Sequence, residues 1–149
     1  MRVREILAVK GKVLYTIAAD KPLADAVATM SEQDVGSLPC FDHGRMVGML
    51  TFREVLGALR ADCAAWSSVA VAEVMVREPV IGLPDMDVAD LRRLMVEKHM
   101  RYLPIMDGDT LLGVISFHDV ARAILDEQGF ENKMLKAYIR DWPQEESVA

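Results

Sequence analysis

The sequence has no long apolar run, and it contains only two cysteines. None of its apolar stretches approaches the roughly 18 residues of a membrane span, and the first twelve residues, MRVREILAVKGK, lack the apolar core of a signal peptide. The cysteines, Cys40 and Cys63, form no CxxC pair and stand among apolar or small residues, which favours two buried free thiols over a disulfide. We therefore expect a cytoplasmic protein with no membrane partner.

The sequence also has no block of basic residues. Its 17 basic and 23 acidic side chains give a net charge of −6, whereas proteins that bind nucleic acid usually carry a basic excess. The apolar content of 52% and the charged content of 27% are those of a folded globular protein. A chain of 149 residues suits one domain, or two half-domains that share a core.

An internal repeat dominates what is present. Residues 14–59 align without a gap on residues 79–124, and 12 of the 46 aligned positions are identical. The lead-ins repeat as well, because VREIL at 3–7 resembles VAEVM at 71–75. The sequence thus predicts two copies of one structural unit.

Each copy predicts the same series of elements. An extended stretch (VLYTI, PVIGL) precedes a helix, which in the first copy has apolar Leu23, Ala26, Val27 and Met30 on one face. A strand, a turn rich in Asp and Gly, a second strand and a closing helix follow. We predict an α/β (α+β) fold in which two β-α-β-β-α units pack face to face, since one unit leaves a sheet face uncovered.

We divide the chain into four segments. Residues 1–62 form the first repeat with its lead-in, 63–70 a linker, 71–128 the second repeat, and 129–149 a C-terminal helix and tail. The tail places an apolar stripe on one side of its helix, made of Met134, Leu135, Tyr138, Ile139 and Trp142. This stripe packs either on the parent fold or on a second copy of the chain.

Each copy places a hydroxyl and a carboxylate three residues apart where its last strand meets the closing helix. Thr51 and Glu54 have the form of a capping box, in which both side chains bind backbone N–H groups. Ser116 and Asp119 suit a cap less well, because Asp is shorter than the preferred Glu or Gln. The alternative is a ligand site, since a helix N-terminus attracts phosphate and a carboxylate accepts ribose hydroxyls.

The repeated corner, GMLTFREV and GVISFHDV, resembles that of CBS domains, named after cystathionine β-synthase. The preceding GSLPCFD and RYLPIMD and the two lead-ins are similar to the same family, so the resemblance covers residues 1–128. It implies a tandem CBS pair with pseudo-twofold symmetry and two clefts that bind AMP, ADP, ATP, S-adenosylmethionine or NAD(H). It also implies a regulatory homodimer that signals to a separate effector protein, with no catalytic residue, catalytic cofactor or metal.

The resemblance assigns residues to both clefts. The main site it implies consists of Thr16, Ile17, Val35, Gly36, Ser37, Arg101, Tyr102, Ser116, His118 and Asp119, with Asp119 on the ribose. The second site consists of Ile81, Met100, Thr51, Arg53 and Glu54. Glu54 replaces the family's usual Asp, so we expect the second site to be weaker, altered in ligand or empty.

Two other functions compete with nucleotide sensing. An enzyme would need a nucleophile and a base, such as Cys40 with His99 or His118, but no nucleophile elbow, P-loop or metal-ligand spacing accompanies them. We expect His99 and His118 at a cleft edge and His43 in a solvent-exposed turn. A scaffold that binds no ligand and only holds a partner is the other alternative.

Overall fold

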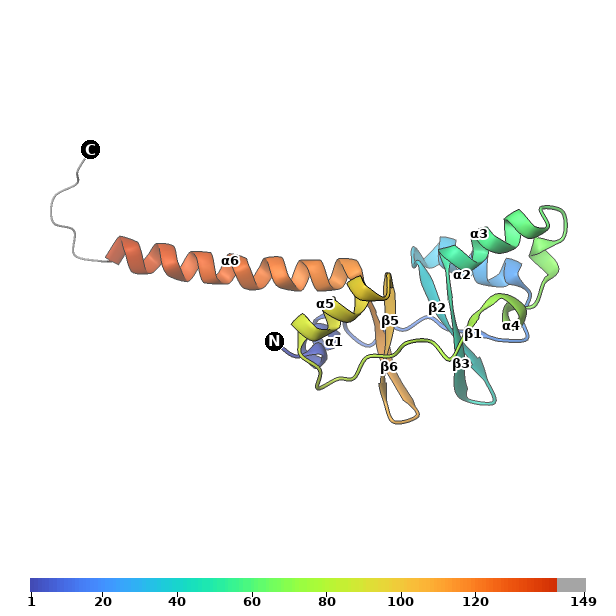
Figure 1. The fold of residues 1–149 in the computed structure, drawn as a ribbon, viewed down its shortest axis with the longest axis horizontal. Helices are drawn as coiled ribbons and strands as arrows, with labels where there is room; N and C mark the ends of the chain where they lie inside the picture. Colours follow the sequence, from blue (N-terminus) through green and yellow to red (C-terminus); the bar gives the residue numbers. More distant parts are fainter. Residues whose placement is uncertain (142–149) are drawn as a thin grey trace.

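The computed structural model describes residues 1–141, in which two similar units of strands and helices lie side by side (Figure 1). The helices are α1 Val3–Lys10, α2 Leu23–Gln33, α3 Phe52–Ala61, the 3-10 helix η1 Trp66–Ser68, α4 Val71–Val74, α5 Val88–Glu97 and α6 Phe117–Asp141. The strands are β1 Ile17–Ala18, β2 Ser37–Asp42, β3 Arg45–Thr51, β4 Val76–Arg77, β5 Tyr102–Asp107 and β6 Thr110–Ser116. The predicted mixed α/β fold is confirmed.

The first unit is built on a sheet with the strand order β1-β2-β3-β4. β1 pairs parallel with β2, as a strand reached through a crossover helix must, and β2 and β3 form an antiparallel hairpin. Leu23, Ala26 and Met30 of α2 are buried on this sheet, as their spacing predicts.

The second unit repeats this arrangement with shorter pairing at its start. β5 and β6 form an antiparallel hairpin, and Val88, Leu91 and Met95 of α5 are buried. The expected extended stretch at 79–83 makes only an isolated parallel bridge, from Gly82 to Ile105.

The two lead-in helices cross between the units. Val3 and Ile6 of α1 belong to the apolar cluster of the second unit, and the Val3 N–H donates to the Met86 carbonyl at 2.9 Å. Val71 and Met75, in and just after α4, belong to the cluster of the first unit. Each unit is therefore completed by the segment that leads into the other, and the connector at residues 11–16 runs from the second unit back to the first.

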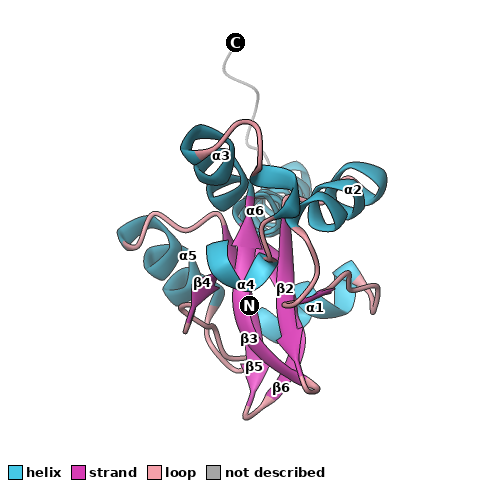
Figure 2. Ribbon diagram, turned by 90° about the vertical axis from the view of Figure 1, so that its right-hand side faces the viewer, coloured by secondary structure: helices cyan, strands magenta, loops and turns pink. Residues whose placement is uncertain are grey.

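The units meet through the sheet faces that their own helices leave uncovered. Along β3, Leu50 faces the cluster of its own unit, and its neighbour Met49 is also buried but lies outside both clusters. Ile115 and Val114 of β6 alternate in the same way. Figure 1 shows the two hairpins between α1 and α5 on one side and α2, α3 and α4 on the other, and Figure 2 shows α4 in front of the strands of the first unit. The predicted face-to-face packing is therefore present.

α6 extends far beyond the units. The sequence suggested a boundary at residue 128, but the structure has one helix of 25 residues, about 37 Å long, that runs away from the first unit (Figure 1). Four apolar side chains of the expected stripe are exposed: Met134, Leu135, Tyr138 and Ile139. The fifth, Trp142, lies outside the described residues.

Both cysteines are free, but only one is buried. Cys40 lies in the first core, whereas Cys63 is exposed. The expectation of a buried Cys63 was wrong because α3 ends at Ala61, and the segment that follows runs over the surface. Among residues 1–141, no helix is both long and apolar enough to cross a membrane.

Candidate functional site

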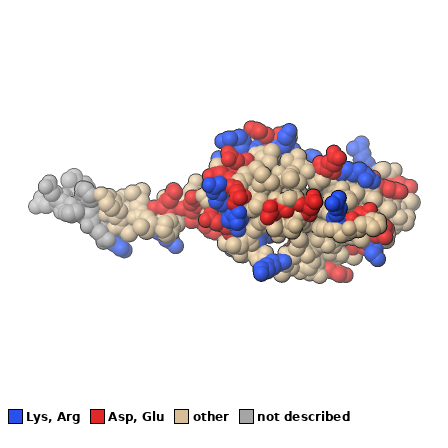
Figure 3. All heavy atoms as spheres, turned by 90° about the horizontal axis from the view of Figure 1, so that it is seen from below, with Lys and Arg blue, Asp and Glu red and all other residues tan. Residues whose placement is uncertain are grey.

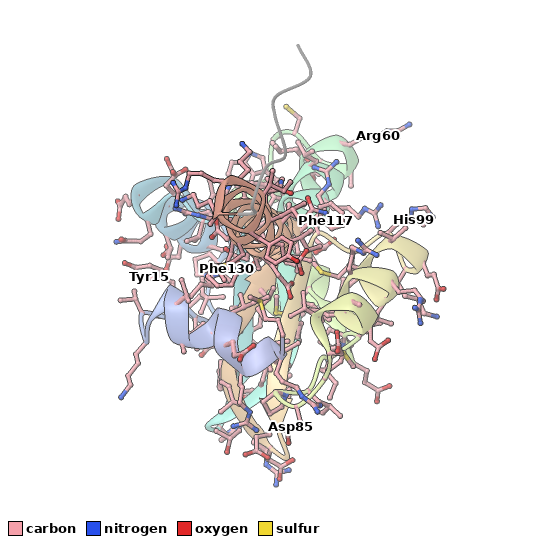
Figure 4. All side chains as sticks on the ribbon, turned by 90° about the vertical axis from the view of Figure 1, so that its left-hand side faces the viewer. Tyr15, Arg60, Asp85, His99, Phe117 and Phe130 are labelled. Atoms are coloured by element: carbon pink, nitrogen blue, oxygen red, sulfur yellow. The ribbon has the colours of Figure 1, made fainter. Side chains whose placement is uncertain are left out.

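A cleft of about 930 Å³ lies between the two units. Its wall comes from four segments: the end of α1 with the connector, the loop before β2, the end of α5 with the loop before β5, and the corner before α6. Figure 4, a view along α6, shows Tyr15 of the connector and His99 after α5 on opposite sides of this helix. The cleft thus brings together segments that are distant in the sequence.

Most of the predicted site residues line this one cleft. From the main site these are Val35, Gly36, Ser37, Arg101, Tyr102, Ser116 and His118, and from the second site Arg53 and Met100. The structure therefore places residues expected in two separate sites around a common space.

The other predicted residues are not among those that line the cleft. Thr16 is exposed, Ile17 is buried in the first core, and Ile81 is 41% exposed. Thr51 is partly buried at the N-cap of α3. The carboxylates Glu54 and Asp119 are partly buried at their corners, and Asp119 directly follows the lining residue His118.

Ser116 and Asp119 form a reciprocal cap. The Asp119 N–H donates to Ser116 Oγ at 3.0 Å, and the Ser116 N–H donates to Asp119 Oδ2 at 2.8 Å. The expectation that this corner suits a cap less well was wrong, because the shorter Asp side chain still reaches the backbone N–H three residues before it.

Asp119 also binds Lys10, a residue that the sequence analysis did not single out. Lys10 Nζ lies 2.8 Å from Asp119 Oδ2 and donates at the same distance to the Val114 carbonyl of β6. Lys10 is the last residue of α1, and it reaches this corner because α1 packs on the second unit.

The surroundings of Asp119 change its acidity. Partial burial alone would raise the pKa of its carboxyl, but hydrogen bonds from Lys10 and Ser116 and the Lys10 charge outweigh burial and hold the pKa below its ordinary value. Asp119 is therefore anionic at neutral pH and already has two donors on one oxygen.

Within residues 1–141, the corresponding corner of the first unit has no lysine partner. Glu54 Oε1 accepts from both the N–H and the hydroxyl of Thr51, each at 2.9 Å, and Thr51 Oγ1 accepts from the Arg53 N–H at 3.3 Å. Both corners are thus helix caps, and Lys10 is what distinguishes them.

The first N–H of each closing helix is also occupied. The Phe52 N–H donates to the Gly36 carbonyl at 3.3 Å, and the Phe117 N–H donates to the Arg101 carbonyl at 2.8 Å. These matching bonds tie the loop before each hairpin to the corner at its end. A phosphate in the cleft would therefore depend chiefly on side-chain cations.

Cationic side chains outnumber carboxylates on the wall. Lys10, Lys12, Arg53 and Arg101 line the cleft, and Asp34 is the one acidic residue that does so in the described part of the chain. The whole chain carries a net charge of −6, so the sign of the charge on the cleft wall is opposite to that of the chain. Such a cleft attracts anions.

Gly36 and Tyr102 are in close contact across the cleft. A methyl group added at Gly36 would overlap the Tyr102 hydroxyl and come within 2.9 Å of Phe52. Glycine at this position therefore gives the tyrosine ring its space on the wall.

The groups considered for catalysis lie in different environments. Burial and the nearby Glu54 carboxylate raise the pKa of the Cys40 thiol to about 12, so it is not a thiolate at neutral pH. His99 and His118 line the cleft as expected, and His43 is exposed in a turn. The described part of the chain holds no group of three or more potential metal ligands among its His, Cys, Asp and Glu residues.

The end of α1 and the connector are the parts of the site that sequence reasoning missed. Lys10, Lys12, Val13, Leu14 and Tyr15 all line the cleft. The two lysines in KGKVLY were a signal of this, but periodicity does not reveal that the lead-in helix packs on the other copy. That crossing brings the segment to the cleft.

Comparisons with known proteins agree with this architecture. The family profile described as the CBS domain matches residues 3–61 and 71–126. The CBS domain-containing protein YhcV of Bacillus subtilis is 34% identical over 107 residues, which are 71% of this chain and 75% of YhcV. The mitochondrial CBS domain-containing protein CBSX3 of Arabidopsis thaliana is 28% identical over 126 residues, 81% of this chain and 61% of CBSX3.

Solved structures share the fold. A protein with CBS domains from Burkholderia ambifaria superposes with a TM-score of 0.80 at 27% identity, covering 86% of this chain and 96% of that one. The CBS-domain protein ATU1752 of Agrobacterium tumefaciens superposes with a TM-score of 0.79 at 25% identity, covering 83% of this chain and 98% of that one. CBSX2, solved in complex with AMP, superposes with a TM-score of 0.68 at 24% identity, covering 77% of this chain and 90% of that one.

Proposed function

The chain belongs to the CBS-domain family, and we propose that it is a regulatory module that binds an adenine nucleotide in its central cleft and signals to a separate protein. The observation that carries the proposal is the composition of the cleft wall. Four cationic side chains and one carboxylate line the cleft, although the chain as a whole is acidic. The nucleotides we propose are AMP, ADP and ATP.

The cations suit the phosphate part of such a ligand. Arg101 and Arg53 come from different units, so a phosphate between them would link the units by charge-assisted hydrogen bonds. Arginine offers a planar fork of donors that matches phosphate geometry. Ligand binding would in this way change how the two units hold each other.

The apolar part of the wall suits an adenine ring. Val35 and Met100 occupy equivalent positions in the two loops, and Tyr102 adds an aromatic face. A mainly apolar pocket with a few polar groups is the usual setting for a small-molecule ligand. CBSX2, which shares the fold, binds AMP according to its structure, and this supports a nucleotide of that class here.

We propose a homodimer as the assembly, with α6 as the contact. Its outer turns expose Met134 and Leu135, and covering them against a second copy would remove apolar surface from water. Charge favours an antiparallel arrangement: acidic Asp126, Glu127 and Glu131 precede basic Lys133, Lys136 and Arg140. Figure 3 shows acidic side chains, with basic ones among them, where α6 leaves the units. Antiparallel pairing sets opposite charges together, whereas parallel pairing sets like charges together.

A thermal-shift screen tests the proposed function. The ligands are AMP, ADP, ATP, NAD⁺, NADH and S-adenosylmethionine, and a ligand at 100 times its dissociation constant adds about 2.7 kcal/mol of stability. Stabilisation by AMP, ADP or ATP without turnover supports the proposal. Stabilisation by NAD(H) or S-adenosylmethionine alone would reassign the ligand, consumption of a ligand would indicate an enzyme, and no shift with any ligand would favour a scaffold.

A further inference from the structure

Lys10 binds one oxygen of the carboxylate that the proposed ribose would need. A cis-diol donates two hydrogen bonds to a carboxylate, but Asp119 Oδ2 already accepts from the Ser116 N–H and from Lys10 Nζ, each at 2.8 Å. Asp119 is not among the lining residues, whereas Lys10 is. In this structure it is therefore the lysine, and not the carboxylate that it binds, that lines the cleft.

The lysine can leave this position at moderate cost. Its side chain is 39% exposed and that of Asp119 is 20% exposed, so solvent weakens the ion pair. Gly11, directly after Lys10, has a φ of 86°, and the connector beyond it is exposed on the cleft wall. A change of the lysine rotamer leaves α1 in place.

The opposite corner has no such lysine. Aligning VREIL on VAEVM places Lys10 opposite Glu78, which carries the opposite charge. The Glu54 side chain accordingly accepts its hydrogen bonds at that corner from Thr51. The lysine is thus a feature of one corner and not of the repeat.

We propose that Lys10 makes the cleft select phosphorylated nucleosides by an exchange of partners, an inference that rests on the proposed function. In the exchange, the ribose hydroxyls take the place of Lys10 on Asp119, and the lysine ammonium moves from Asp119 to the ligand's 5′-phosphate. A nucleoside breaks the same ion pair but offers the lysine no new anion. The lysine therefore weakens the binding of adenosine and strengthens the binding of AMP.

Removing the lysine should change the two affinities in opposite directions. In Lys10→Met, adenosine no longer competes with an ion pair, and its affinity should rise about two- to fivefold, the range of a partly exposed pair. AMP loses a charged partner for its phosphate, and its affinity should fall about two- to tenfold. The ratio of AMP to adenosine affinity should therefore fall about tenfold.

Calorimetric titrations of AMP and adenosine into the parent and its variants test the exchange. Lys12→Met is the matched control, because Lys12 lines the cleft and forms no ion pair within residues 1–141: the change should weaken AMP binding and leave adenosine binding unchanged. Lys10→Gln keeps a donor for the Val114 carbonyl and should behave as Lys10→Met does, which guards against a folding defect.

The possible outcomes separate this inference from the proposed function. A parent that binds neither AMP nor adenosine refutes the proposed function and the exchange together. A parent that binds AMP, with the same ratio of AMP to adenosine affinity in Lys10→Met and Lys10→Gln, refutes the exchange alone. A loss of AMP affinity with adenosine affinity unchanged in the Lys10 variants also contradicts it, because the lysine would then be an ordinary phosphate contact, as Lys12 is.

Discussion

Asp119 and Glu54 stand at the same position of the repeat but have different neighbours. Asp119 accepts hydrogen bonds from Lys10 and Ser116, whereas Glu54 accepts from Thr51. The residue types at each corner, a hydroxyl and a carboxylate three residues apart, did not reveal this difference. The lysine belongs to α1, more than a hundred residues earlier in the chain. Its position depends on packing between the units.

The lowered pKa of Asp119 makes part of the stability depend on pH. A carboxyl whose folded pKa lies below its unfolded value, about 3.9 for Asp, stabilises the fold above that value. This contribution disappears as the pH falls through the folded pKa. Asp119→Asn should therefore lower the unfolding free energy by up to about 1 kcal/mol at neutral pH, a value limited by solvent screening.

Urea unfolding at several pH values measures this effect. The gap between the parent and Asp119→Asn should be constant from neutral pH down to about 5 and should close at more acid pH. Asp107→Asn, at an exposed carboxylate at the end of β5, is the control and should show a small gap throughout. A gap that widened towards acid pH would show that the Lys10 pair does not stabilise the fold.

Gly36 offers a second test at the residue scale. In Gly36→Ala the new methyl group must displace the Tyr102 ring from the cleft wall. We expect a loss of about 1 kcal/mol of stability from overpacking and about tenfold weaker AMP binding. Gly57→Ala is the matched control, because nothing lies within 4 Å of its added carbon, and it should stabilise α3 by about 0.5–1 kcal/mol. Unchanged AMP affinity in Gly36→Ala would place the ligand away from Tyr102.

At the scale of elements, α6 is the clearest candidate for a contact with a second copy. Leu135→Glu puts a charge into its exposed apolar stripe. This change should raise the dissociation constant of the dimer at least tenfold, so that monomer becomes more abundant. Leu56→Glu makes the same change at an exposed leucine of α3 and should leave the dimer intact. Analytical ultracentrifugation measures both. Dissociation by Leu56→Glu, with none by Leu135→Glu, would move the contact to α3.

Individual elements could be predicted from the sequence where the signal is local. The spacing of Leu23, Ala26 and Met30 predicts one buried helix face, and α2 has it. The crossing of α1 and α4 could not be predicted, because periodicity shows that a helix has a buried face but not which copy covers it. The same limit applies to the connector, and hence to Lys12 and Tyr15 in the cleft.

At the scale of the whole molecule, the repeat explains both the architecture and the cleft. Two units, each with one uncovered sheet face, bury those faces on each other, and the two loops and corners then meet around a common space. The repeat predicts that Val35 and Met100, or Gly36 and Arg101, take equivalent positions on the wall. It does not predict the excess of cations, which comes from residues that differ between the copies.

Calorimetric titration of AMP into the parent, Asp119→Ala and Glu54→Ala tests most directly the claim that the cleft binds a nucleotide through the corner of the second unit. The parent should bind saturably, and Asp119→Ala should bind about ten- to a hundredfold more weakly, the effect of losing charged hydrogen bonds to the ribose. Both variants lose a cap and should be about 0.5–2 kcal/mol less stable, but Glu54→Ala should keep the parent's affinity. Parental affinity in Asp119→Ala, or loss of binding in Glu54→Ala alone, would contradict the account.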